Sequence, residues 1–302
     1  MNAQPSISEL SDFHTRLRGD GVRLRTGPFS MCVRSSLNTV ANALQLLYGD
    51  FPSVPDNAFV DFHVRVDSPS ALRRIVRPQV QFYVDERTPF QPLPLDQAFP
   101  MLEWGLNWCV VNHAHEFLII HSAVVAHRDR TVILPGDPGS GKSTLCSALV
   151  QEGWTLLSDE MCLIDLDSGL LHALARPINL KNDAIDLLAD RYPHAVFGPR
   201  CVDTAKGAVA HLKPPSDSIR QVDITHRATH VVWPRYLSGS PVLTETLNGA
   251  TATLSLVQNA FNYDVLGPLA FHKLCDTIDG CATLEFTYSD LDDGIAFFAD
   301  LD

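Results

Sequence analysis

The sequence has no apolar run long enough to cross a membrane. A membrane helix needs about 18 apolar residues in a row. The most apolar stretch, WCVVNHAHEFLIIHSAVV, is interrupted by three histidines, an asparagine and a glutamate. The opening MNAQPSISEL lacks a basic region followed by an apolar core, so we expect no secretory signal. These absences predict a cytoplasmic protein without a membrane partner.

Paired cysteines are also missing. The seven cysteines stand apart, none forms a CxxC pair, and their number is odd. Disulfide frameworks and zinc sites use even or closely spaced sets. We therefore expect buried free thiols in a reducing compartment.

Positive charge is scarce. The chain carries 23 Lys and Arg against 35 Asp and Glu, a net charge of −12, which argues against general nucleic-acid binding. Between His172 and Arg235, however, nine basic residues meet six acidic ones. A locally basic segment in an acidic protein suits an anionic ligand in a cleft, although chance clustering also produces an excess of this size.

Prolines divide the chain into two expected domains. Residues 36–47 have apolar side chains at helical spacing after a serine, and 61–66 and 80–84 have the composition of strands. PFQPLPLD then places three prolines in eight residues, a poor interior for any element. We predict a smaller N-terminal α+β domain of unknown role over 1–95 and a larger α/β domain over 96–302.

The larger domain is expected to begin with a helix over 97–111. Two β-rich runs follow, FLIIHSAVVA and TVILP, with a hairpin at HRDR. TVILP leads directly into GDPGSGKST, after which 143–152 has the pattern of a helix that stops at Gly153. WTLLSDE is the next expected strand, and MCLIDLDSGLLHAL is expected to form a hairpin turning at 167–169.

GDPGSGKST has the spacing of a Walker A phosphate loop. Glycines let backbone N–H groups point inward at phosphate oxygens, and the start of the following helix adds partial positive charge. Lys142 is expected to reach the β- and γ-phosphates of ATP, and Ser143 to ligate Mg²⁺. An ordinary glycine turn before a helix is the alternative. The expected nucleotide-binding residues are Gly136, Asp137, Pro138, Gly139, Ser140, Gly141, Lys142, Ser143 and Thr144.

Two adjacent acids end the strand after the loop. Asp159 and Glu160 close LLSDE, one short helix after the lysine. In nucleotide-binding proteins of this kind a carboxylate at the end of a neighbouring strand lies beside the magnesium. We therefore expect Ser143, Asp159 and Glu160 to hold the metal. A solvated strand end or a helix cap remains the alternative for Asp159.

HSAVV, VILPGDPGSGKSTL and GWTLLSDE together resemble the catalytic domain of HPr kinase/phosphorylase, a bacterial protein-serine kinase. They are also similar to the more distant phosphoenolpyruvate carboxykinases. RPINLKN, KGAVAHLKPP and NAFNY resemble the proteins called HprK-related kinase A. The likeness covers about residues 97–300. It implies a P-loop kinase domain of this type with a mixed twisted sheet, beside the N-terminal α+β domain.

The resemblance implies a catalytic role for three residues. Lys142 matches the loop lysine that holds phosphate, and Asp159 matches the base toward the substrate serine. His121 matches an active-site histidine near metal or phosphate; from the sequence alone, a histidine on a core strand is the alternative. Glu160 stands where the family has Asp, and Thr144 where it has Glu. These departures indicate a divergent relative.

The downstream Glu-x-Arg-Gly signature of HPr kinase is not visible in this chain. In that region we select Arg176, Lys181 and Lys206 as candidates for contact with substrate or phosphate, with Arg200 as a fourth. Taken alone, each is typical of a surface cation.

The expected function is an ATP- and Mg²⁺-dependent kinase that transfers the γ-phosphoryl group to a hydroxyl. The resemblance implies a serine of a protein or peptide as the acceptor, and the ring-like HPr kinases imply a homo-oligomer. Two alternatives remain. One is a kinase that acts on a metabolite, and the other is an ATP-binding accessory factor for peptide maturation.

Overall fold

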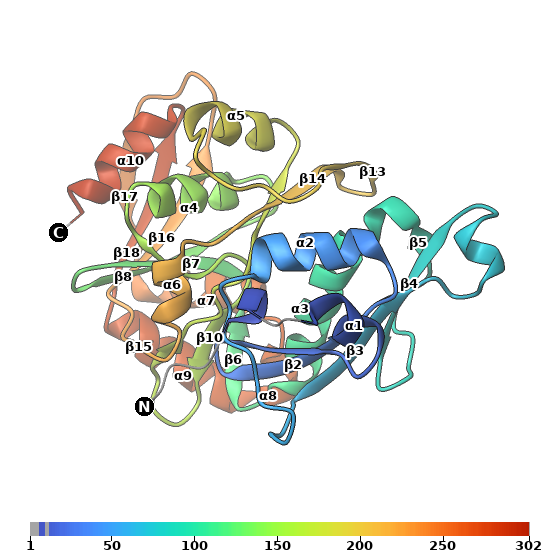
Figure 1. Cartoon of the computed structure of the whole chain (residues 1–302). Coiled ribbons are helices and arrows are strands. Elements are labelled where there is room, and N and C mark those ends of the chain that lie inside the picture. The colour runs from blue at the N-terminus through green and yellow to red at the C-terminus, as the bar shows by residue number, and fades with distance from the viewer. Residues whose placement is uncertain (1–5, 10–11, 302) are drawn as a thin grey trace.

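The computed structural model describes residues 6–9 and 12–301. Its strands lie in four sheets, of five, four, three and six strands (Figure 1). Parallel and antiparallel pairs occur together in the five-stranded and six-stranded sheets. The fold is therefore α/β with mixed sheets.

The five-stranded sheet comes from the first third of the chain. In VRLRT and FHVRVD, apolar residues alternate with polar ones, so one face of the sheet is buried. Its strands, in spatial order, are β1 (Val22–Thr26), β2 (Phe29–Arg34), β3 (Phe62–Asp67), β4 (Gln79–Val84) and β5 (Leu93–Pro94). The helices of this part are α1 (Phe13–Arg18), α2 (Asn38–Tyr48) and α3 (Ala98–His113).

The helices and strands expected around the proline-rich segment are present as α2, β3, β4 and α3. Helix α3 packs on β3, β4 and α2. Its apolar side chains therefore lie in the same core as the first sheet. That core also takes in Ile119, Met161 and Leu174 from later in the chain. Because the two parts share a core, the domain boundary near Leu95 stays a prediction.

Four strands of the six-stranded sheet have their carboxyl ends along the same border of the sheet. In spatial order its strands are β17 (Leu243–Thr246), β18 (Ala282–Tyr288), β16 (His230–Tyr236), β8 (Arg130–Pro135), β7 (Ser122–His127) and β9 (Thr155–Ser158). β8, β16 and β18 run parallel, and β7 runs antiparallel to both β8 and β9. The carboxyl ends of β8, β9, β16 and β18 therefore meet at one edge.

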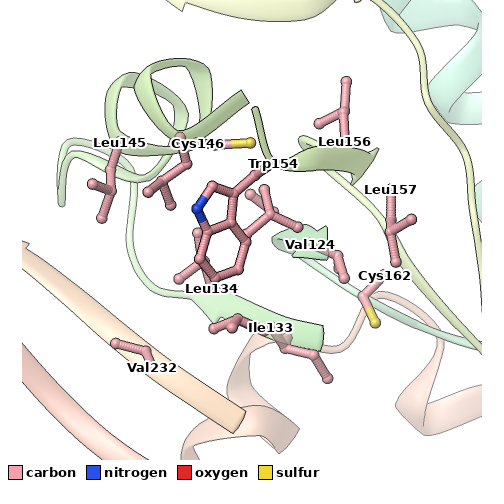
Figure 2. Close-up of a cluster of buried hydrophobic side chains, with 14 of the residues drawn as sticks. Val124, Ile133, Leu134, Leu145, Cys146, Trp154, Leu156, Leu157, Cys162 and Val232 are labelled. Atoms are coloured by element: carbon pink, nitrogen blue, oxygen red, sulfur yellow. The ribbon is translucent and has the colours of Figure 1, made fainter. Parts of the chain in front are cut away.

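Helix α4 (Lys142–Gln151) follows β8 and packs back onto this sheet. Figure 2 shows Leu145 and Cys146 on the helix beside Ile133 and Leu134 of β8, all fully buried. Burying one aliphatic side chain contributes about 1.5–3 kcal/mol. Apolar contacts therefore fix the segment between β8 and α4 at both ends.

The run FLIIHSAVVA, expected as one β-rich segment, divides at His121. β6 (Phe117–Ile120) pairs with β10 in the four-stranded sheet, whereas β7 pairs with β8. The expected hairpins at HRDR and at 167–169 are both present. The remaining strands are β10 (Cys162–Asp165), β11 (Leu171–His172), β15 (Thr225–His226), β12 (Ile178–Lys181), β13 (Cys201–Thr204) and β14 (Gly207–Leu212).

The remaining helices surround the six-stranded sheet and its neighbours. They are α5 (Asp183–Arg191), α6 (Ser216–Arg220), α7 (Gly249–Asn259), α8 (Tyr263–Leu266), α9 (Pro268–Asp279) and α10 (Leu291–Ala299). Within 6–9 and 12–301, no helix combines the length and hydropathy that a membrane crossing requires. The seven cysteines are free; five are buried as expected, whereas Cys275 and Cys281 are only partly buried.

Candidate functional site

GDPGSGKST forms a tight loop between the end of β8 and the start of α4. Gly139 and Gly141 have φ of +90° and +94°, a region that disfavours residues with side chains. A Cβ on Gly141 would also lie 2.7 Å from the hydroxyl of Tyr288. Gly139, in contrast, faces open space. The strand–loop–helix context required of a phosphate loop is therefore present.

Lys142 lies within this loop, with 7% of its surface exposed. Its Nζ donates hydrogen bonds to the carbonyl oxygens of Gly136 and Asp137, the second at 3.0 Å. Burial, together with the positive charge of Lys181, lowers the pKa of Lys142. Phosphate oxygens would replace two neutral carbonyls as its hydrogen-bond acceptors, and such charge-assisted bonds are stronger.

Asp159 follows the end of β9 and is almost fully buried, with 6% exposed. Its Oδ2 accepts a hydrogen bond of 3.0 Å from the backbone N–H of Asn179. Its Oδ1 is buried without a hydrogen-bond partner among the described residues. Burial and the neighbouring Glu160 raise the pKa of Asp159 to about 7, although Asn179, Ser143 and Lys142 oppose this shift.

Glu160 is held quite differently from Asp159. The side-chain amide of Asn179 donates to its Oε1 at 3.1 Å, and the amide of Asn107 on α3 donates to its Oε2. Burial raises the pKa of Glu160, but the Asn179 amide and the charge of Arg176 outweigh burial and lower it. Glu160 is therefore an ionised carboxylate with both oxygens engaged.

His121 lies at the junction of β6 and β7, beside the acid pair. Its Nδ1 is 3.2 Å from the carbonyl oxygen of Glu160, and the ring of Phe261 meets it edge-on at 5.4 Å. Burial and the charge of Lys142 lower the pKa of His121. The imidazole is therefore neutral at pH 7, and if its Nδ1–H donates to the carbonyl oxygen of Glu160, its Nε2 can accept one hydrogen bond in the cleft.

These side chains converge on one cleft of about 560 Å³, within the range of small-molecule sites. Of the five lysines in the sequence, 142, 181 and 206 line this cleft. Such a concentration favours an anionic ligand. The lining residues are His121, Pro138, Gly139, Gly141, Lys142, Ser143, Thr144, Asp159, Glu160, Asn179, Leu180, Lys181, Asn182, Ala184 and Lys206.

The candidate cations divide into those at the cleft and those elsewhere. Lys181 ends β12 and is half-buried at the cleft. Lys206 lies at the exposed turn between β13 and β14, with Nζ 5.5 Å from the ring centre of Trp104. Arg200 forms an exposed ion pair with Asp186 at 2.6 Å and does not line the cleft.

Arg176, another candidate for contact with phosphate, does not line this cleft, and such a contact stays a prediction. Only 6% of it is exposed, and its Nη2 pairs with Glu103 Oε2 at 2.8 Å. Glu103 Oε1 in turn accepts a 2.6 Å hydrogen bond from Tyr48. Arg176, which stands just before β12, is therefore linked through Glu103 to α3 and through Tyr48 to α2, and it does not face the cleft.

A second, small chamber lies on the other side of the two acids. Its volume is about 20 Å³, room for about one water. Several of its polar lining atoms are buried without a partner among the described residues, and a water would satisfy some of them. They are Trp104 Nε1, Arg176 Nε and Nη1, Asn179 Oδ1, and both ring nitrogens of His211.

The residues at the end of the loop fit a magnesium ion. Mg²⁺ prefers oxygen ligands and usually binds through one or two carboxylates together with phosphates and water. Ser143 offers a hydroxyl, and Asp159 offers a buried oxygen without a partner. Across the described chain, no group of three or more His, Cys, Asp and Glu could hold a metal by itself. Direct ligation by Glu160 stays a prediction, since its oxygens are engaged.

Two site residues were missed from the sequence. Asn179 lies in RPINLKN, a segment from which only the basic residues were selected as candidates, yet it contacts both acids. Asn107 lies on α3 and carries no motif. A single amide on an apolar helix gives no signal of a contact 53 positions away.

No protein-family model matches the chain, and no curated protein matches it either. Among solved structures, the Hpr(Ser) kinase/phosphatase from Coxiella burnetii is similar over 60% of this chain and 91% of that chain. The sequence identity is 12% and the TM-score is 0.29. A likeness this distant assigns no role to any residue of the cleft.

Proposed function

We propose that the protein is an ATP- and Mg²⁺-dependent kinase that transfers the γ-phosphoryl group to a hydroxyl, in particular a serine of a protein or peptide. The observation that carries this proposal is the position of Asp159. It lies in the same cleft as the phosphate loop, buried, with one oxygen free to take a ligand or a proton. A loop alone would indicate nucleotide binding, whereas the adjacent acid adds a group that can activate a hydroxyl.

Each cleft residue would act by position and charge, as phosphoryl transfer requires. Backbone N–H groups from Gly139 to Ser143 would hold the phosphates, and Lys142 would neutralise the negative charge on the transferred phosphoryl group. Ser143 and Asp159 would hold Mg²⁺, which neutralises phosphate charge when bound. Asp159 would accept the proton of the acceptor hydroxyl.

The space around the acids limits the route by which an acceptor can reach them. The chamber on the far side of Asp159 and Glu160 holds about one water. The acceptor must therefore approach through the mouth of the larger cleft, as a chain segment can. A metabolite kinase and an ATP-binding accessory factor remain the competing functions, and cytoplasmic location and a homo-oligomer remain expectations.

The test is transfer of labelled phosphate. The protein would be incubated with γ-labelled ATP and Mg²⁺, with proteins encoded by neighbouring genes or with a metabolite set. We expect label on a protein serine. Asp159→Asn should reduce transfer by about 10²–10⁴-fold while nucleotide binding persists.

The matched control is Asp190→Asn, an exposed acid on α5 that lies outside the cleft; it should leave transfer unchanged. Label on a metabolite would establish the small-molecule alternative. Slow ATP hydrolysis with no acceptor in either set, and no effect of Asp159→Asn on partner function, would establish the accessory factor instead.

A further inference from the structure

The sheet fixes which way a nucleotide must lie in the cleft. The phosphate loop leaves β8, and Asp159 leaves β9 on one side of it, with β7 between them. On the other side of β8 lie β16 and then β18, whose carboxyl ends meet the same edge. If the γ-phosphate lies toward Asp159, as the proposed function requires, the nucleoside end points toward β16 and β18.

Tyr236, the last residue of β16, lies at that end. Its backbone N–H donates to the carbonyl oxygen of Ser140 in the loop at 3.0 Å. A Cβ placed on Gly141 would come within 3.2 Å of the Tyr236 Cβ. The tyrosine therefore adjoins the loop directly, although its ring is 50% exposed.

The surface around Tyr236 is apolar for a region at the mouth of a charged cleft. Leu237, Val242 and Leu243 are 48%, 44% and 56% exposed. They belong to the connection from β16 to β17 and to the start of β17. On the inner side, Tyr288 meets the Tyr236 ring edge-on at 5.9 Å and supports it. A half-exposed tyrosine, held by Tyr288, thus lies beside the phosphate loop and just outside the residues that line the cleft.

We infer that Tyr236 is the stacking platform for the nucleobase, with Leu237 and Leu243 as apolar neighbours. The inference rests on the proposed function for the direction of the nucleotide. An aromatic ring stacks with any base, because every base has a π-face. A nucleotide would then extend from a phosphate site inside the cleft, built from backbone and lysines, to a base site at the ring just outside the cleft lining.

The test compares two probes that share a phosphate chain. MgATP and Mg-tripolyphosphate would be titrated into the full-length protein and its variants. Tyr236→Ala should weaken MgATP binding about tenfold and leave tripolyphosphate binding unchanged. Tyr236→Phe should bind MgATP as the unchanged protein does. Alanine keeps the backbone bond to Ser140 and the Cβ beside Gly141, so the loop itself is preserved.

Tyr83→Ala is the matched control, since Tyr83 lies on β4 in the first sheet. Equal loss of both probes in Tyr236→Ala would overturn the inference, because the ring would then support the loop and not the base. No loss of either probe would overturn it as well. If the unchanged protein binds MgATP but transfers no phosphate, the kinase proposal fails while the platform stands.

Discussion

The loop that lines the cleft and the group of side chains behind the two acids are built in opposite ways. One, the loop wall, is residues 136–144, where consecutive residues present backbone N–H groups and Lys142. The other, the α3 wall, is Asn107, Glu103 and Arg176 with Tyr48, whose side chains meet from distant parts of the chain. Arg176 and Glu103 are 73 positions apart.

This contrast separates ligand binding from folding. Within the loop wall only Lys142 is buried, so the residues other than its glycines can change with little cost to the stability of the fold. The α3 wall contains a buried ion pair next to the acids. Removing one partner of such a pair lowers the stability of the protein strongly. We therefore expect changes in the loop wall to affect ligands first and changes in the α3 wall to affect stability first.

The largest expected effect comes from breaking the buried pair. Glu103→Ala leaves the Arg176 charge buried without its partner, and we expect unfolding free energy to fall by about 3–5 kcal/mol. Urea unfolding measures this loss, with Glu116→Ala as the exposed control.

Lys142→Met in the loop wall should retain stability and lose ATP binding. Equal losses of stability in Glu103→Ala and Lys142→Met would contradict the contrast between the loop wall and the α3 wall.

The second effect depends on pH. The folded protein holds the Asp159 proton up to about pH 7, whereas an ordinary aspartate loses it near 3.8. The folded state therefore binds the extra proton between these values, and stability falls as pH rises through this window. In metal-free buffer, Asp159→Asn should be more stable above pH 7 by up to about 4 kcal/mol. The difference should vanish near pH 4; a constant difference at all pH values would contradict this origin.

The third effect concerns the amide that reaches the acids from α3. Asn107→Ala removes the donor to Glu160 Oε2, and loss of such a supporting contact typically reduces activity about 10–100-fold. Once an acceptor is identified, we expect kcat to fall while KM for ATP changes little. Asn112→Ala on the same helix bonds only its own turn and serves as the control. A rise in KM alone would place Asn107 in substrate binding.

The smallest effect is expected at Lys206, which is exposed over Trp104. Lys206→Ala should change stability by less than about 1 kcal/mol. It should weaken MgATP binding up to about fivefold at low salt, and less at high salt, because exposed charges are screened. Titrations at two salt concentrations measure this, with Lys273→Ala as the control. No effect at low salt would exclude Lys206 from the phosphate site.

Local patterns explain how much of the molecule could be predicted. Helix α4, the β7–β8 hairpin and the phosphate loop follow from neighbouring residues, so the sequence predicted them. The break at His121 arises because the two halves of one β-rich run pair with strands of different sheets. The periodicity of the sequence does not show which strands a segment will pair with. Asn107 and the Glu103–Arg176 pair depend on chain segments meeting in space. For the same reason, the pairing of Arg176 with Glu103 could not be predicted from the sequence.

Because the chain has few lysines, the lysines of the cleft can be labelled chemically with little labelling elsewhere. Of five primary side-chain amines, those at 142, 181 and 206 line it, and each differs in burial. An acyl-phosphate derivative of a nucleotide would deliver its label to whichever amine lies beside its reactive phosphate. Peptide mapping of that label would then report the depth of the phosphate chain in the cleft, without an acceptor substrate being known.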